Sequence, residues 1–360
     1  MTVATAPAPT NTASRPTEVL SYALRRGQGL PALQPRRVSL PELGEFDVQV
    51  RIRAVALNHR DLMLVDGRAG PADRWVTPGS DAAGEVVAVG ASVRDFRVGD
   101  RVISQFFPHW RSGPATPQAT ALALGGSMDG VLAEQVVLPA AAWLPMPKSL
   151  SFTEAATLSC AGVTAWHALF GFDPLTAGAS VALLGTGGVS IWALQLAKAA
   201  GIRVLITSSD QSKLHHATEL GADHTLNYRQ TPRWGEALRE LNGGEGVDRV
   251  LDIGGPDTLA QSIAALRYGG SVAVIGRLTG SAPAQLDPAE LFLENKRLVG
   301  LMVGSHSMTR ALSAFVDQHA IRPVIDGVFG FDQVRDAFAH LASGSHFGKV
   351  VIDLDQGHRP

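Results

Sequence analysis

The clearest pattern of apolar and polar positions in the chain lies between Ser180 and Leu226. The short aliphatic run SVALL is followed by the turn GTGGVS, at residues 185–190. Next, IWALQLAKAAG carries apolar residues at helical spacing and ends at a glycine, and RVLIT is a second apolar run. The spacing of the apolar residues changes from that of a strand to that of a helix and back. The segment therefore predicts a strand, a glycine turn, a helix and a second strand. This order is half of a dinucleotide-binding fold.

The glycine turn is the first candidate binding site. Its backbone must bend sharply and approach a pyrophosphate, whose charge then meets the free N–H groups of the helix start. A serine stands where the usual fingerprint has its third glycine, and an ordinary glycine-rich turn is the alternative; the position between a strand and a helix favours the dinucleotide site. We therefore predict that the cofactor contacts Gly185, Thr186, Gly187, Gly188, Val189 and Ser190.

The rest of the chain divides around this unit. Short apolar runs separated by Gly, Pro and Asp fill residues 18–152 and predict a compact, β-rich, barrel-like domain. Residues 153–307 alternate between strand and helix patterns, which is typical of a parallel sheet. Residues 308–360 are too few for a separate domain, so we expect them to return to the first one. Residues 1–17 lack an apolar core and predict a disordered tail.

Composition excludes several classes of partner. The 360-residue chain has a net charge of −2, without the excess of Lys and Arg that nucleic acid or an acidic membrane surface requires. Its single cysteine, Cys160, excludes an internal disulfide and fits a reducing cytoplasm. The uncharged stretch from Ala177 to Ala197 is long enough to cross a bilayer, but its glycines and its two-strand context favour a buried α/β core. We expect a cytoplasmic protein that acts on a small molecule.

Residues 105–130 form a long segment without periodicity. It contains proline and glycine, and a long loop in a compact domain is more often functional than not. Phe106, Phe107 and Trp110 would provide an apolar wall for a substrate, and a simple surface excursion is the alternative.

Seven segments, taken together, resemble one family. AVALNHRDLML, PGSDAAGEVVAVG, VGDRV, SCAGVTAWHALF, GTGGVSIWALQLAKAAG, ELGADHTLNY and HFGKVVI are similar to motifs of the medium-chain dehydrogenase/reductase superfamily, and most of all to its zinc-free quinone-oxidoreductase-like and enoyl-reductase-like branch. The resemblance implies an α/β fold in which a GroES-like β-barrel catalytic domain carries an inserted Rossmann domain, with the active site between them. It also implies a homodimer through the edges of the Rossmann sheets, at RLVGLMVGS.

The same comparison predicts that no metal is bound. At the positions where zinc-dependent members carry their ligands, this chain has Asn58, Ser80 with Asp81, and Cys160. Catalytic zinc needs about three N, S or carboxylate ligands. Among these residues we expect only Cys160 to be a strong ligand.

The end of the second Rossmann strand bears on the choice of nicotinamide cofactor. A carboxylate there would bind the ribose 2′-OH of NAD and repel the 2′-phosphate of NADP, but the position carries Ser208. The resemblance implies that a serine, Lys213 and Tyr228 surround the phosphate, and Ser209 is a further candidate. We therefore predict NADPH in preference to NADH. Asp210 could instead accept the ribose hydroxyl, although we favour a helix N-cap.

Further cofactor contacts follow from the resemblance. They comprise a threonine in CAGVT, two strand-end turns and the lysine of HFGKVVI; for the glycine pairs the alternative is a plain turn. These residues are Thr164, Gly254, Gly255, Ile275, Gly276 and Lys349.

Without a metal, the acceptor must be stabilised by hydrogen-bond donors in a dry cleft. Asn58 has an amide that can donate to the acceptor oxygen, His59 could bind phosphate or substrate or supply a proton, and Asp61 would orient them. Both Asn58 and His59 have structural alternatives. We predict hydride transfer to a quinone or to the C=C bond of an α,β-unsaturated carbonyl. A zinc-type alcohol dehydrogenase and a non-catalytic NADPH-binding scaffold or sensor remain alternatives.

Overall fold

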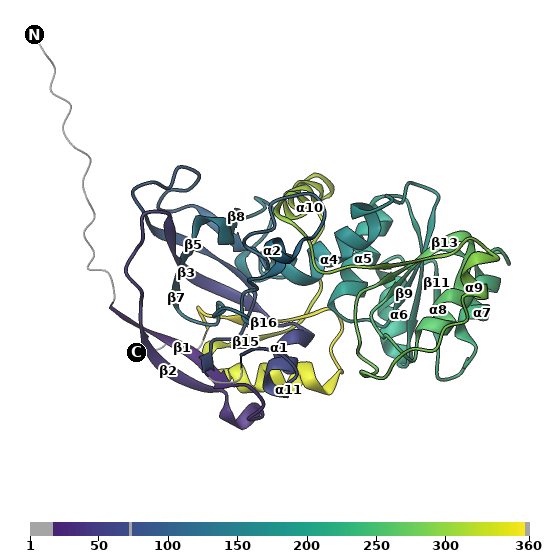
Figure 1. Ribbon diagram of the computed structural model, residues 1–360, viewed down its shortest axis with the longest axis horizontal. Helices are drawn as coiled ribbons and strands as arrows, with labels where there is room; N and C mark the ends of the chain where they lie inside the picture. Colours follow the sequence, from purple (N-terminus) through teal and green to yellow (C-terminus); the bar gives the residue numbers. More distant parts are fainter. Residues whose placement is uncertain (1–16, 72–73, 357–360) are drawn as a thin grey trace, which may run out of the picture.

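A computed structural model describes residues 17–71 and 74–356 of the chain, so most of the predicted tail lies outside the described residues. The molecule is elongated, with a β-rich half and a parallel-sheet half side by side (Figure 1). No helix among these residues is long and apolar enough to cross a membrane.

The β-rich half is built around a seven-stranded sheet to which both ends of the chain contribute. Its order is β15-β16-β3-β5-β6-β8, and β7 also pairs with β3. The bounds are β3 (Asp47–Ala56), β5 (Asp81–Val89), β6 (Arg101–Ser104), β7 (Gln135–Pro139), β8 (Trp143–Pro145), β15 (Ile325–Gly330) and β16 (Lys349–Asp353). The C-terminal strand β16 lies antiparallel to β3, with Val351 opposite Ala56. This pairing brings the residues after β3 and those before β16 to one edge of the cleft.

Smaller elements cover this sheet. A three-stranded sheet has the order β2-β1-β4, and short helices fill the connections. These elements are β1 (Glu18–Arg25), β2 (Gln34–Ser39), β4 (Trp75–Val76), α1 (His59–Val65), α2 (Pro117–Thr120) and α11 (Val334–Ser343), with 3-10 turns at Leu30–Ala32, Ala140–Ala142 and Phe331–Gln333.

The other half is a Rossmann domain. Six parallel strands have the order β11-β10-β9-β12-β13-β14, which is the doubly wound order with its switch point between β9 and β12. The strands are β9 (Ser180–Leu184), β10 (Arg203–Ser208), β11 (His224–Asn227), β12 (Val247–Asp252), β13 (Leu266–Val274) and β14 (Arg297–Gly300). The helices are α5 (Gly188–Ala199), α6 (Gln211–Glu219), α7 (Trp234–Leu241), α8 (Leu259–Ala265) and α9 (Ala289–Phe292). The predicted fold class is confirmed.

The long uncharged stretch owes its composition to this sheet. Every residue of β9 is buried, because a central parallel strand is covered on both faces. The stretch continues through the glycine turn into α5, whose inward face is also buried. It is therefore a core strand and helix.

A helical junction connects the two halves. It comprises α3 (Phe152–Ala155), α4 (Val163–Trp166), α10 (His306–His319) and π-helical turns at Leu158–Gly162 and His167–Gly171. A capping box begins α3, because Ser151 N donates to Glu154 Oε2 at 2.8 Å and Glu154 N donates to Ser151 Oγ at 3.3 Å. One hydrophobic cluster runs from Ile103 and Leu144 of the catalytic sheet to Leu183 of the Rossmann sheet. The two halves thus share a core, which fixes the cleft between them.

Candidate active site

The glycine turn lies at the switch point of the Rossmann sheet and touches the C-terminal strand of the other half. Gly185 has a φ of +70°, the left-handed conformation that favours glycine. Gly348 N, just before β16, donates to the Thr186 carbonyl at 3.0 Å. Gly187 and Gly348 also form an isolated parallel bridge. The start of α5 therefore lies at the boundary between the two halves of the molecule.

The residues of this turn differ in their surroundings. A Cβ at Gly188 would lie 2.7 Å from Lys349 Cδ, whereas a Cβ at Gly187 would meet only His346 Nε2, at 3.9 Å. The Ser190 hydroxyl donates to the Leu184 carbonyl at 2.7 Å. This hydrogen bond holds α5 close to β9. In other dinucleotide-binding folds the third glycine of the fingerprint allows the same close packing of helix and strand. Gly187 thus leaves the backbone open to a ligand, Gly188 accommodates the lysine, and the serine hydroxyl already has a partner inside the fold.

The end of β10 collects the residues predicted around the 2′-phosphate. Ser208 is the last residue of the strand, and its carbonyl accepts from Tyr228 N at 3.2 Å. The Lys213 ammonium donates to the Gly344 carbonyl, in the loop before β16, at 2.7 Å. Asp210 is the N-cap of α6 and accepts from Ser212 N and Lys213 N, so the favoured interpretation of this residue is confirmed.

Two turns at the ends of β12 and β13 lie side by side. The Asp252 carboxylate accepts from Gly254 N and Gly255 N, at 2.9 Å each, while its backbone carbonyl accepts from Ile275 N at 2.8 Å. A Cβ at Gly276 would lie 2.4 Å from the Ile253 carbonyl oxygen. The structure therefore brings these predicted contacts together at the carboxyl edge of the sheet. Thr164 is buried in α4.

A buried polar cluster lies between β3, β5 and β16. Lys349 is 3% exposed, and its Nζ donates to the carbonyl of Leu57 and to Oδ1 of Asn58, at 2.6 Å each. The same Nζ is 4.0 Å from Asp81 Oδ2. Sequence reasoning assigned Lys349 to the cofactor and passed over Asp81 as a site residue. Here the lysine stem passes beside Gly188 and its charged end reaches Asn58.

Asp81 is fully buried at the start of β5. It accepts from Ser80 Oγ at 2.6 Å, from Cys160 N at 3.0 Å, and from the Asn58 side chain. Burial raises the pKa of its carboxyl group, and the Lys349 charge, followed by the hydrogen bonds from Ser80 and Asn58, opposes that increase.

The neighbouring thiol is not ionised at neutral pH. Burial, with the Asp81 charge as the next cause, raises the pKa of Cys160 to about 12. A thiol in this state is a weak nucleophile. Cys160 also packs against the aromatic cluster described below.

Asp61 and His59 occupy different environments. The Asp61 carboxylate accepts from Asn58 N at 2.8 Å and from Gly79 N at 3.1 Å, so it holds the two loops that carry Asn58 and Asp81. Burial raises its pKa and Arg60 opposes this. His59 is exposed at the start of α1. Partial desolvation of its ring, followed by the Arg68 charge, lowers its pKa.

The three aromatic residues of the 105–130 segment point inward. Phe106, Phe107 and Trp110 are between 1% and 6% exposed and pack together. The Arg60 guanidinium lies 4.3 Å from the centre of the Phe106 ring and donates to the Leu124 carbonyl. Arg60 therefore supports this cluster. Trp110 also borders a cavity of about 770 Å³ at the ends of β13 and β14.

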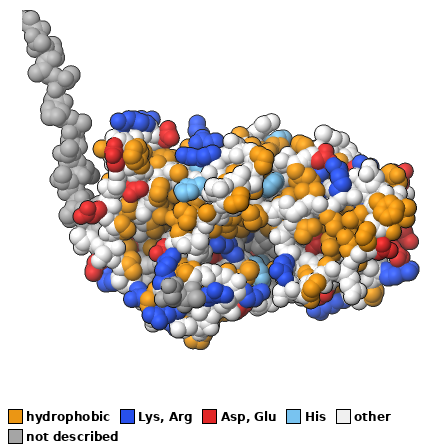
Figure 2. Space-filling model, in the orientation of Figure 1, with side chains coloured by type: hydrophobic (Ala, Val, Ile, Leu, Met, Phe, Trp, Pro, Cys, Tyr) orange, Lys and Arg blue, Asp and Glu red, His pale blue; other side chains and the backbone are white. Residues whose placement is uncertain are grey.

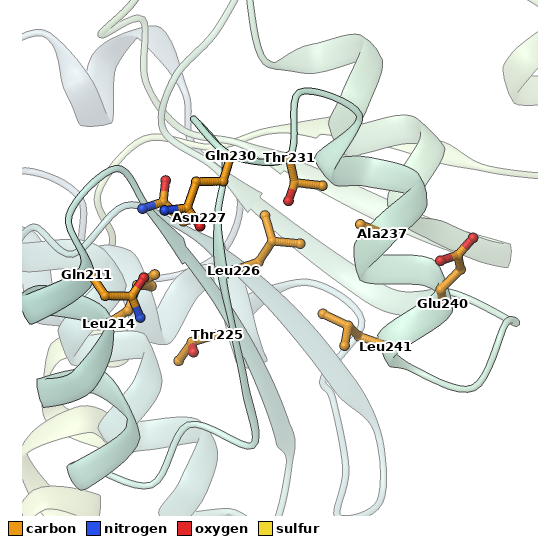
Figure 3. A pocket seen from close by; sticks show the side chains of 10 residues that line it. All are labelled: Gln211, Leu214, Thr225, Leu226, Asn227, Gln230, Thr231, Ala237, Glu240 and Leu241. Carbon is orange, nitrogen blue, oxygen red and sulfur yellow. The ribbon is translucent and has the colours of Figure 1, made fainter.

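A second cavity, of about 520 Å³, lies on the outer edge of the Rossmann sheet. Figure 3 shows the side chains that line it. It lies between α6, β11 and α7, and its lining combines leucines with uncharged polar side chains and Glu240. The glycine turn and the Lys349 cluster contribute nothing to it, so we do not assign it to the reaction.

This arrangement is that of a two-domain dehydrogenase, with a doubly wound sheet facing a β-rich domain across a cleft. Residues 44–148 match the family described as an alcohol dehydrogenase GroES-like domain. Residues 188–318 match the family described as a zinc-binding dehydrogenase.

Individual proteins agree with these matches. A zinc-type alcohol dehydrogenase-like protein of Schizosaccharomyces pombe is 42% identical, covering 91% of this chain and 96% of its own length. A quinone oxidoreductase-like protein 2 homolog of Nematostella vectensis is 28% identical, covering 91% of this chain and 87% of its own. A crystal structure described as an alcohol dehydrogenase of Sinorhizobium meliloti is 40% identical, with a TM-score of 0.88, and covers 95% of this chain and 100% of that one. The chain belongs to the medium-chain dehydrogenase/reductase superfamily and is an oxidoreductase.

Proposed function

We propose that this oxidoreductase uses NADPH, needs no zinc, and transfers hydride to a quinone or to the C=C bond of an α,β-unsaturated carbonyl. The observation that carries the proposal is the contact between the Lys349 ammonium and Asn58 Oδ1, at 2.6 Å. A fixed cation already occupies the side of Asn58 that would otherwise face a metal.

The donor set does not fit a catalytic zinc ion. Zinc needs about three N, S or carboxylate ligands, and no group of three such side chains suited to a metal occurs in residues 17–71 and 74–356. The Asn58 oxygen is taken by an ammonium, and Asp81 already accepts three hydrogen bonds. Stoichiometric zinc that copurifies with the protein and survives dialysis would contradict this part of the proposal.

The Rossmann half, in contrast, has features that suit a bound dinucleotide. A Cβ at Gly187 would meet nothing closer than 3.9 Å, and the free N–H groups of the twelve-residue helix α5 begin there. The strand end carries Ser208, and the nearest carboxylate, Asp210, is committed to capping α6. The absence of a free carboxylate at this position favours the 2′-phosphate of NADPH over the ribose hydroxyl of NADH.

A bound nicotinamide supplies the hydride, and the chain's own residues handle the charge that develops on the acceptor. The Asn58 amide donates to the Ala56 carbonyl at 3.4 Å, which is at the long limit for a hydrogen bond. The other N–H of this amide donates to Asp81, so we expect an acceptor oxygen to share the long N–H without any rotation of the amide. The lysine on Oδ1 polarises the amide and strengthens the donor. A donor that faces a developing oxyanion contributes a few kcal/mol to catalysis.

A panel of acceptors tests the reaction. NADPH oxidation is followed with enones, quinones and aldehydes, and NADP⁺ reduction with primary and secondary alcohols, before and after treatment with a chelator. Turnover of enones or quinones that survives chelation supports the proposal. Alcohol oxidation that is lost with the metal would establish the zinc-type alternative instead, and tight NADPH binding without any turnover would establish the scaffold.

Ser208→Asp tests the cofactor. The new carboxylate should weaken NADPH binding at least tenfold, while changing NADH binding much less, because it faces the 2′-phosphate. Ser39→Asp adds the same charge on exposed β2 of the other half and should change neither affinity. Equal effects of Ser208→Asp on both dinucleotides, measured by fluorescence titration, would contradict the assignment.

We propose a cytoplasmic homodimer that acts on a small molecule, assembled through the edge strand β14. Hydrophobic side chains gather at the Rossmann end of the face shown in Figure 2, and Tyr268, Phe292, Leu293 and Met302 are all about half exposed or more. Exposed patches of this kind mark protein contacts. Sedimentation showing a monomer at micromolar concentration would contradict the dimer.

A further inference from the structure

The cavity at the ends of β13 and β14 is bordered by both halves of the molecule. Its volume is about 770 Å³, which is typical of a small-molecule site. Trp110 comes from the catalytic half, Val274 and Leu301 come from the Rossmann half, and Phe172 follows the helical junction. The cavity therefore lies between the segment predicted to face the substrate and the sheet predicted to hold the cofactor.

The surroundings of the cavity connect it to the predicted reaction site. Val274 directly precedes the turn at residues 275–276, a predicted cofactor contact, and its carbonyl accepts from Leu301 N at 3.1 Å. On the other side, Trp110 belongs to the aromatic cluster that packs against Cys160, whose N–H donates to Asp81. One wall thus borders the cofactor turn, and the other leads to the buried polar cluster.

Hydrogen bonds fix these walls. His306 N donates to the Trp110 carbonyl at 2.9 Å, which ties the loop to the start of α10. Val303 has a φ of +36°, which is rare for a β-branched residue, and its carbonyl accepts from His167 Nδ1 at 3.0 Å. A backbone conformation of this kind persists only where its surroundings hold it. The cavity is therefore preformed.

The lining of the cavity is apolar and uncharged. Among the described residues that line it, none is Asp, Glu, Lys or Arg, and only His167 can ionise. Burial lowers the pKa of His167, which favours its neutral ring. The Arg249 guanidinium lies 4.1 Å from the centre of the Phe172 ring, but it is 1% exposed and donates to three backbone carbonyls. The cavity thus suits an uncharged, apolar group.

Two methionines supply the adaptable part of this lining. Met302 follows β14 and is 49% exposed. Met308 of α10 lies against two glycines: a Cβ at Gly171 would be 3.2 Å from its Cε, and a Cβ at Gly304 would be 3.3 Å from its Sδ. Methionine side chains fit ligands of irregular shape. An apolar ligand in the cavity would contact both of them.

We propose that this cavity holds the apolar body of the acceptor, so that the enzyme prefers enones or quinones with a large, uncharged, apolar substituent. Small acceptors, and acceptors whose substituent ends in a carboxylate or phosphate, are then poor substrates. Met302 and Met308 touch the substituent and determine this specificity. The inference rests on the proposed function and names the substrate class of the same site.

Acceptors that differ only in length test the substrate class. 3-Nonen-2-one is longer than 3-penten-2-one by four methylene groups, and each buried methylene should raise kcat/KM about fourfold. We expect a preference of at least tenfold for the longer ketone. For quinones, 2-pentyl- and 2-methyl-1,4-benzoquinone form the same pair. 9-Oxodec-7-enoate, which is the longer ketone with a carboxylate on its last carbon, should lose at least tenfold, because the lining offers that charge no partner.

Variants of the two methionines test the location. Met302→Ala and Met308→Ala should each lower kcat/KM several-fold for the longer acceptor and less than twofold for the shorter one. Met302→Leu and Met308→Leu should keep most of the preference. Met128→Ala, which truncates a partly buried methionine outside the cavity, is the matched control and should leave the preference unchanged. A purely structural effect would lower the turnover of both acceptors alike.

The outcomes separate this inference from the proposed function. No turnover of any enone or quinone would remove the proposed function, and this inference with it. Turnover that is independent of substituent length, or undiminished by the carboxylate, would overturn only the substrate class. A length preference that survives both alanine variants would place the substituent elsewhere and contradict the role of the cavity.

Discussion

Replacing Lys349 by methionine removes the cation from the buried cluster and keeps most of the side-chain volume. Asp81 is fully buried and Lys349 is 3% exposed, so the change leaves a carboxylate without its nearest positive charge. Breaking a buried pair in this way costs about 3 to 5 kcal/mol. Because the Nζ to Oδ2 distance of 4.0 Å is long and Ser80 Oγ and Cys160 N still donate, we expect about 3 kcal/mol at pH 7.5.

The loss of stability in Lys349→Met should be larger at high pH than at low pH. Without the lysine, burial holds the folded-state pKa of Asp81 above its unfolded value, so the folded variant keeps a proton that the unfolded chain releases. A group of this kind stabilises the fold at low pH, and this stability falls as the pH rises. The deficit relative to the original protein should therefore shrink by up to about 1.4 kcal/mol for each pH unit between 7.5 and 5.5.

Thermal and urea unfolding at the two pH values measure this deficit. Adding Asp81→Asn to Lys349→Met should recover much of the stability at pH 7.5, because the unpaired charge is gone. Lys213→Met is the matched control: that ammonium contacts a carbonyl, not a buried carboxylate, so its effect should be small and independent of pH. A Lys349→Met deficit that is the same at both pH values, with no recovery in the double variant, would refute the reasoning.

Two further perturbations separate the roles of neighbouring residues. Gly188→Ala puts a Cβ 2.7 Å from Lys349 Cδ and should destabilise the fold by about 1 to 3 kcal/mol, whereas Gly187→Ala, with nothing nearer than 3.9 Å, should keep the melting temperature and weaken only dinucleotide binding. Equal melting temperatures for the two variants would contradict the geometry. The Cys160 thiol, with its pKa of about 12, should react with a thiol reagent very slowly at pH 7.5 and about tenfold faster for each added pH unit. A fast reaction of the folded protein at pH 7.5 would show that the thiol is not held in this state.

The fold was largely accessible from the sequence, because its signals are local. The strand, glycine turn, helix and strand between Ser180 and Thr207 follow from periodicity alone, and the capping roles of Ser151 and Asp210 follow from residue type and spacing. The inward direction of Phe106, Phe107 and Trp110 could not be foreseen. A loop without periodicity gives no information about which of its side chains face the core.

The polar cluster was harder to predict for a different reason. Lys349 and Asn58 are 291 positions apart in the chain and meet only because β16 pairs with β3, which no local pattern encodes. Family resemblance suggests the lysine as a cofactor ligand, which stays a prediction; its stem passes beside Gly188 and its ammonium ends on Asn58. One side chain thus touches both the turn predicted to hold the dinucleotide and the amide predicted to meet the acceptor. If a dinucleotide displaced the Lys349 stem from Gly188, it would also move the charge on Asn58, and binding of the cofactor would then be coupled to polarisation of the acceptor site through this residue.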